Sequence, residues 1–229
     1  MYSNYKNKSI IHKFIDRLQR RDKGNFLLLI RNYTVYLNTK VFHSKLFFKD
    51  KARSHIISQI KKNSVIVEVG VWQGNFSKII NDFCKPKELV LVDMWKYDNR
   101  VRGCAPQVDG QEPISQNFFD EAYIKTKNKF AYHQNVKILK KSSKEASKFY
   151  NNNYFDYIYI DAEHSYKAVY DDLNHWFPKL KKNGYLFGDD YYWREEDNTF
   201  SLQNAYQDFL RKNDIRKWCV FKSQIMIKK

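Results

Sequence analysis

Short apolar runs rich in β-branched residues alternate with helical segments from residue 64 onward, and this alternation restricts the fold more than any other feature. The runs lie at residues 65–69, 89–93, 136–139, 155–160 and 185–188. They are typical of strands that are buried on both faces of a parallel sheet. Helices are predicted between and after them, at residues 75–84, 114–130, 164–181 and 202–212. Strands that alternate with helices predict a doubly wound α/β fold.

The end of the chain predicts a different kind of pairing. Residues 218–221 and 224–227 are two further strand-like runs separated by Lys222-Ser223, which indicates an antiparallel hairpin. Asn183-Gly184 is expected to cap the helix at 164–181. One connection, residues 94–135, is unusually long, and an insertion of that length commonly contributes to a site or a lid.

Residues 1–63 lack this alternation and are predicted to form a basic, mainly helical extension. Apolar side chains recur at helical spacing in residues 10–18, and a further helix is predicted at 52–60. The extension holds 15 Lys and Arg against 3 Asp and Glu. We therefore divide the chain into an extension, 1–63, and a domain, 64–229, and expect the extension to act as a lid, a homodimer contact or a surface contact.

The whole chain carries 41 Lys and Arg against 25 Asp and Glu, a formal charge of +16. Such a charge is compatible with nucleic acid, an anionic membrane surface or an acidic substrate. However, 31 of the 41 basic residues are Lys. This usage is expected of an AT-rich genome, where Lys fills solvated faces, so the charge says little about the chemistry. If the charge has a function, it is to attract an anionic glycan, its lipid carrier or a membrane to the walls of the site.

The sequence predicts a cytoplasmic protein. Cys84, Cys104 and Cys219 form neither a CxxC motif nor a disulfide framework. No apolar run approaches the length of a membrane span, and residues 1–6 are not followed by the apolar region of a secretory signal.

The first strand leads into a glycine turn that can form part of a cofactor site. Glu68, Gly70 and Gly74 lie at its end, and valines replace the glycines that the dinucleotide motif GxGxxG would need. Asp93 ends the second strand, where a carboxylate can accept hydrogen bonds from the hydroxyls of a ribose. These two features favour a nucleoside-type cofactor, and the alternative is a plain strand–helix turn with a capping Asp.

A second group of acids follows the fourth and fifth strands. Asp161 ends one strand, His164 comes three residues later, and Asp189-Asp190 end the next strand. Neighbouring parallel strands bring these ends together, and three carboxylates at close range repel one another unless a cation lies among them. Oxygen ligands suit Mg²⁺ first, with Mn²⁺ or Ca²⁺ as alternatives. The competing interpretation is that Asp189-Asp190 shape a turn and that His164 caps a helix.

Taken in order, these motifs resemble those of class I S-adenosylmethionine-dependent methyltransferases, and most closely the metal-dependent O-methyltransferases of catechols, macrolide sugars and glycans. The block at 160–169, followed by Trp176, Pro178, Leu180 and Gly184, resembles the sugar and glycan branch. The resemblance begins at Ser64 and leaves residues 1–63 outside it. It implies a Rossmann-like sheet of seven strands, mostly parallel, with a terminal antiparallel strand.

The resemblance also implies roles for single residues. Glu68, Gly70 and Gly74 would lie beside the methionine part of S-adenosylmethionine, Asp93 would hold its ribose, and Ser142 or Ser143 would lie near the adenine. The metal ligands would be Asp161, Asp189 and Asp190, and Asp161 would also contact the cofactor and take part in catalysis. His164 stands where relatives carry a Lys or His base.

The resemblance thus implies methyl transfer to a hydroxyl of a sugar, a glycan or a similar small polar acceptor. A metal would lower the pKa of the hydroxyl, and His164 would take its proton. Two alternatives remain: an RNA methyltransferase that uses the basic extension, and a non-catalytic Rossmann-like binding module.

Overall fold

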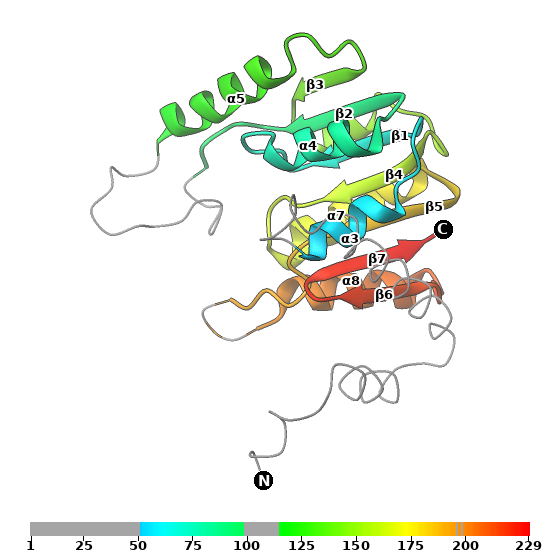
Figure 1. Ribbon diagram of the computed structural model, residues 1–229. Helices are drawn as coiled ribbons and strands as arrows, with labels where there is room; N and C mark the ends of the chain where they lie inside the picture. The colour runs from blue at the N-terminus through cyan, green and yellow to red at the C-terminus, as the bar shows by residue number, and fades with distance from the viewer. Residues whose placement is uncertain (1–50, 99–114, 196, 198) are drawn as a thin grey trace, which may run out of the picture.

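The computed structural model describes residues 51–98, 115–195, 197 and 199–229, and its core is a single seven-stranded sheet (Figure 1). The strands are β1 (Val65–Val69), β2 (Glu88–Asp93), β3 (Val136–Lys140), β4 (Phe155–Ile160), β5 (Leu180–Gly188), β6 (Trp218–Phe221) and β7 (Gln224–Lys228). The helices are α3 (Lys51–Gln59), α4 (Asn75–Ile79), α5 (Gln116–Phe130), α6 (Ser143–Ser147), α7 (Tyr166–Trp176) and α8 (Ser201–Lys212). A π turn, η2 (Ile80–Cys84), extends α4, and a 3-10 turn, η3 (Phe177–Lys179), follows α7.

The strand order is β3-β2-β1-β4-β5-β7-β6. Strands β1 to β5 pair in parallel, β7 is antiparallel to β5, and β6 is antiparallel to β7. The predicted Rossmann-like, mostly parallel sheet and its closing hairpin are therefore confirmed. Strands β2 and β3 are added on one side of β1, and β4 and β5 on the other side. The order of the strands therefore reverses between β1 and β4, and ligands bind at this point in open α/β sheets.

Side chains alternate between the two faces of the sheet and build two separate cores. On one face Val67 and Ile158 pack with α7 and α8, whereas Ile66 and Tyr159 on the other face pack with α3, α4 and α5. Figure 1 shows α3 and α4 in front of the sheet and α7 and α8 behind it. Because both faces are covered, the central strands β1, β2 and β4 are mostly apolar and buried, as their sequence indicates.

Helix α3 joins the last part of the basic extension to the domain. Ile56, Ile57 and Ile60 are buried in the same core as Phe187 and Met226. The helix therefore packs on the sheet, although it precedes the predicted boundary at residue 63. That boundary stays a prediction. The helix expected at 10–18 and the first part of the insertion, residues 99–114, lie outside the described residues.

The helix expected to run to residue 181 ends earlier, and its predicted cap belongs to a strand. Helix α7 stops at Trp176, and Pro178 in η3 lacks the N–H that a continuing helix would need. Asn183 and Gly184 lie inside β5, next to an irregularity in its pairing with β4. A Cβ at Gly184 would lie 2.7 Å from the carbonyl oxygen of Asp156, so this glycine serves the close approach of two strands rather than a helix end.

No helix in the described part of the chain combines the length and the apolar character that a bilayer crossing requires.

Gly188 at the end of β5 has no room for a side chain. A Cβ there would lie 1.8 Å from the hydroxyl oxygen of Tyr206, which α8 buries against the sheet. We expect Gly188→Ala to lower the free energy of unfolding by about 1–3 kcal/mol, since overpacking forces the neighbours to shift. Urea unfolding measures the loss. Adding Tyr206→Phe removes the nearest atom and should recover part of it, and an equal loss in the double variant would contradict the packing argument.

Candidate active site

The loops that follow β1 and β4 touch at the edge of the sheet. The N–H of Gly70 donates to the carbonyl of Val92 at 2.9 Å, and the N–H of Asp161 donates to that of Val69 at 2.8 Å. A Cβ on Gly70 would lie 1.9 Å from the carbonyl oxygen of Asp161, and Gly70 has a φ of 87°. Only glycine fits this contact, which brings the predicted cofactor loop against the predicted metal ligand.

Asp93 holds the glycine loop through its carboxylate. One oxygen accepts hydrogen bonds from the N–H groups of Val71 (3.0 Å) and Trp72 (2.9 Å), and the other accepts one from Trp95 (2.8 Å). A carboxylate offers about four acceptor positions, so roughly one is left for a ribose hydroxyl. The capping role that competed with the ribose role is therefore present in the structure, and it leaves room for a cofactor contact.

Helix α5, which lies within the long insertion, supports the same loop from outside. The carbonyl of Trp72 accepts hydrogen bonds from the indole of Trp95 at 2.7 Å and from the hydroxyl of Thr126 at 2.9 Å. Lys129 donates to the carbonyl of Gln73 at 2.8 Å. The described part of the insertion thus shapes the loop, and no sequence motif pointed to Thr126 or Lys129.

Glu68 lies buried beneath the loop at the end of β1. Burial raises the pKa of its carboxyl to about 8, with repulsion from Asp161 and Asp93 adding to the rise. Its Oε2 atom has no hydrogen-bond partner among the described residues. An unsatisfied buried acceptor next to a glycine turn fits a bound group that brings its own donors, such as the amino acid part of S-adenosylmethionine.

Ser142 and Ser143 both have structural partners. Ser142 caps α6 through a capping box with Glu145. Ser143 donates to the buried carboxylate of Asp172 and accepts a hydrogen bond from the indole of Trp176 at 2.7 Å. Their placement after β3 agrees with the sequence analysis, and the expected contact with an adenine stays a prediction.

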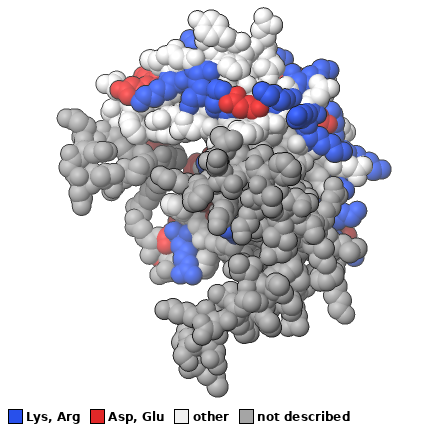
Figure 2. All heavy atoms as spheres, viewed as in Figure 1, with Lys and Arg blue, Asp and Glu red and all other residues white. Residues whose placement is uncertain are grey.

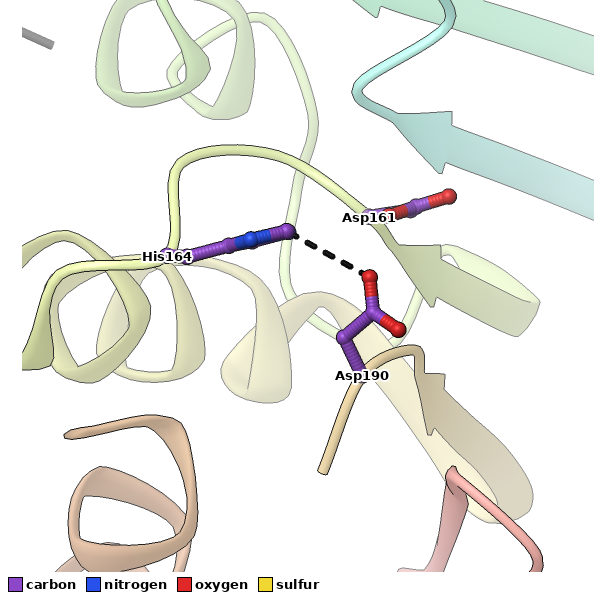
Figure 3. Close-up of side chains that lie close together, drawn as sticks. All are labelled: Asp161, His164 and Asp190. Carbon is purple, nitrogen blue, oxygen red and sulfur yellow. Dashed lines mark ion pairs between the residues drawn. The ribbon is translucent and has the colours of Figure 1, made fainter. Parts of the chain in front are cut away.

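Asp161, His164 and Asp190 form one cluster beyond the ends of β4 and β5. One ligand atom from each lies within 4.8 Å of the others. Figure 3 shows His164 and Asp190 directed toward each other, with 3.7 Å between Nε2 and Oδ2. Two carboxylates suit Mg²⁺, which usually binds proteins through one or two carboxylates and keeps several of its waters.

Asp189 was also expected among the metal ligands, but its carboxylate is occupied by protein donors. Oδ2 accepts hydrogen bonds from Tyr159 (3.0 Å) and Arg53 (2.8 Å), and Oδ1 accepts from Gln224 and from the N–H of Asp190 (2.8 Å). The sequence analysis missed Arg53, Tyr159 and Gln224. Arg53 and Gln224 are far from Asp189 in the sequence, and no motif marks any of the three.

His164 is neutral at pH 7 in these surroundings. Burial lowers the pKa of its imidazole from the ordinary 6.5, and the nearby carboxylate of Asp190 opposes the shift only in part. The ring lies 4.7 Å from that of Trp193. A neutral imidazole beside the carboxylates can accept a proton, and exposed Tyr192 and Trp193 provide aromatic surface next to it.

Glu68, the buried acid beneath the glycine loop, should make the free energy of unfolding depend on pH. A carboxyl whose pKa is raised on folding binds more protons in the folded chain, so the free energy of unfolding should fall between about pH 5 and pH 8, by at most ~1.4 kcal/mol per unit. Glu68→Gln should remove the share of this fall that Glu68 contributes, while the buried carboxyl of Asp172, whose pKa is raised to about 7, keeps its own share in both proteins. Urea unfolding of the apo protein across this range tests it, with Glu121→Gln on the exposed side of α5 as the control. Parallel curves for the wild type and Glu68→Gln would contradict the shift.

Comparisons with known proteins agree with the geometry. A family model described as a methyltransferase domain matches residues 67–191, more than half of the chain. No curated protein matches the sequence. The matched region contains every residue predicted for cofactor and metal binding and leaves out Arg53 and Gln224.

Three solved structures show the same fold at low identity. A Clostridium thermocellum protein described as an rRNA methylase aligns with a TM-score of 0.54 and 13% identity, over 78% of this chain and 96% of its own. A Corynebacterium glutamicum protein aligns with a TM-score of 0.56 and 9% identity, over 96% and 97%. The O-methyltransferase NovP aligns with a TM-score of 0.50 and 15% identity, over 88% and 80%.

Since the family model spans the glycine loop, the acid after β2 and the ends of β4 and β5, the chain belongs to the methyltransferase-domain family and is a class I S-adenosylmethionine-dependent methyltransferase.

Proposed function

We propose that this methyltransferase transfers the methyl group to a hydroxyl of a sugar, a glycan or a similar small polar acceptor, with a divalent metal, Mg²⁺ first. The observation that carries the proposal is the cluster of Asp161, His164 and Asp190 beside the glycine loop. Two carboxylates supply hard oxygen ligands, and a neutral imidazole supplies a proton acceptor within the same few ångströms.

Each group has a separate task in this reaction. When bound, a divalent ion lowers the pKa of an acceptor hydroxyl and fixes its position. Asp161 and Asp190 would hold that ion, and His164 would take the hydroxyl proton at Nε2. The close approach at Gly70 brings the cofactor loop against Asp161, so that the methyl donor and the acceptor oxygen would be held at close range.

The basic surface favours an acceptor with negative charge, such as an anionic or lipid-linked glycan. Figure 2 shows Lys and Arg gathered in a band across the top of the view, where α5 and β3 lie in Figure 1. Lys125, Lys137 and Lys140 are paired with acids, which reduces the charge of this face. Lys129 donates to the carbonyl of Gln73, so the basic residues of this face reach the glycine loop.

Removal of the metal tests the reaction class. Methyl transfer to a panel of sugars and glycans, with RNA included as an acceptor, should stop in EDTA and return with Mg²⁺. Asp161→Asn and Asp190→Asn should lose activity in Mg²⁺, whereas Asp171→Asn on the exposed side of α7 should keep it. Full activity in EDTA would refute the metal dependence, and methylation of RNA alone would refute the acceptor class.

His164 makes a separate prediction about the pH profile. Because its pKa is lowered, the neutral form persists below pH 6.5, so kcat/KM should fall only at lower pH. His164→Ala should reduce kcat by about 10²–10⁴-fold and abolish this acid limb, with little change in the affinity for S-adenosylhomocysteine. His175→Ala, at the far end of α7, is the control. An unchanged acid limb in His164→Ala would exclude His164 as the base.

A further inference from the structure

Arg53 reaches the candidate active site from outside the matched methyltransferase region. It belongs to α3, in the segment that the sequence analysis assigned to the basic extension. Its Nη2 atom donates to Asp161 Oδ2 at 2.7 Å and to Asp189 Oδ2 at 2.8 Å, and its Nε donates to the same oxygen of Asp189 at 3.1 Å. One guanidinium therefore joins the acids that end β4 and β5.

The protein holds this guanidinium in place from several sides. It lies over the ring of Phe76, 5.0 Å from the centroid, and Tyr159 donates to the same oxygen of Asp189 as Arg53 does. The side chain of Asp189 is only 8% exposed, against 22% for Asp161. Arg53 thus compensates a buried carboxylate that would otherwise lie uncompensated next to the metal ligands.

The acceptor positions of Asp189 are filled by this arrangement. Its two oxygens receive hydrogen bonds from Arg53, Tyr159, Gln224 and the N–H of Asp190, and a carboxylate has about four positions to offer. An ion that coordinated Asp189 would have to displace one of these donors. Asp161 and Asp190, by contrast, lie together with His164, with one ligand atom from each within 4.8 Å of the others.

We propose that Arg53 is a positioning residue that keeps Asp189 out of the metal site and shares Asp161 with the ion, and that it thereby sets the affinity of the enzyme for divalent metal. The inference rests on the metal-dependent reaction proposed above. A positive charge a few ångströms from the ion weakens its binding, and the same charge fixes which two carboxylates are left to bind it.

Direct metal binding tests the inference without an activity assay. The full-length apo protein is titrated with Mn²⁺, and the free ion is followed by its electron paramagnetic resonance signal. Arg53→Gln is expected to bind Mn²⁺ at least about tenfold more tightly than the wild type, since it removes a positive charge and releases Asp189. Arg53→Lys keeps the charge and should stay close to the wild type. Arg211→Gln, at an exposed ion pair on α8, is the control.

Asp189→Asn and Asp190→Asn each remove one negative charge, so comparing them distinguishes the roles of these two neighbouring acids. Asp190→Asn should weaken Mn²⁺ binding at least about tenfold, and Asp189→Asn should weaken it less, because it removes a nearby negative charge but not a ligand. Thermal unfolding with and without Mn²⁺ reports whether each variant is folded. Because a tighter ligand stabilises the folded state more, Mn²⁺ should raise the Tm of Arg53→Gln more than that of the wild type.

The outcomes distinguish this inference from the proposed function. Tighter binding by Arg53→Gln supports it, and so does binding that only Arg53→Gln shows. Unchanged or weaker binding by Arg53→Gln, with a wild type that binds Mn²⁺, overturns the role of Arg53 and leaves the metal-dependent reaction intact. A stronger loss in Asp189→Asn than in Asp190→Asn overturns it as well. Absence of binding in both the wild type and Arg53→Gln refutes the metal site and the inference together.

Discussion

The contact between Gly70 and the backbone of Asp161 is the constraint on which the site depends. Both residues end parallel strands that pair with each other, and their loops approach so closely that a methyl group at residue 70 would overlap the carbonyl oxygen of Asp161. This approach places the loop that would hold the methyl donor directly beside the acids that would activate the acceptor. The backbone alone therefore places the predicted cofactor loop beside the predicted metal ligand.

The close approach of these loops brings several carboxyl groups together, and the structure stabilises each of them in a different way. Burial raises the pKa of Glu68 to about 8, so the acid is largely neutral at pH 7. Asp189 is equally enclosed but receives donors at both oxygens, including a guanidinium. Asp93 is half-buried and is satisfied by backbone N–H groups of the loop that it supports. Asp161 and Asp190 combine partial exposure with proximity to the imidazole of His164.

Much of this could be predicted from the sequence because the relevant signals are local. The β-branched runs placed the strands, and the position of Asp93, Asp161 and Asp190 at strand ends followed from parallel pairing. The capping role of Ser142 and the inclusion of Asn183 in β5 were missed, because a capping box and a strand irregularity depend on contacts that periodicity does not report. Arg53 could not be predicted, since its partners lie 108 and 136 residues away.

Arg53 also shows which positive charge acts on the candidate site. Much of the excess of Lys and Arg lies in residues 1–63, and at the α5 edge Lys125 and Lys140 pair with acids, which weakens their charge. A single guanidinium between Asp161 and Asp189 acts at under 3 Å on half-buried and buried acids, where the same unit charge has a far larger effect. Helix α3 lies outside the matched family region, yet it supplies that charge. The part of the extension that packs on the sheet is therefore a component of the site, and its contribution is one placed cation rather than a basic surface.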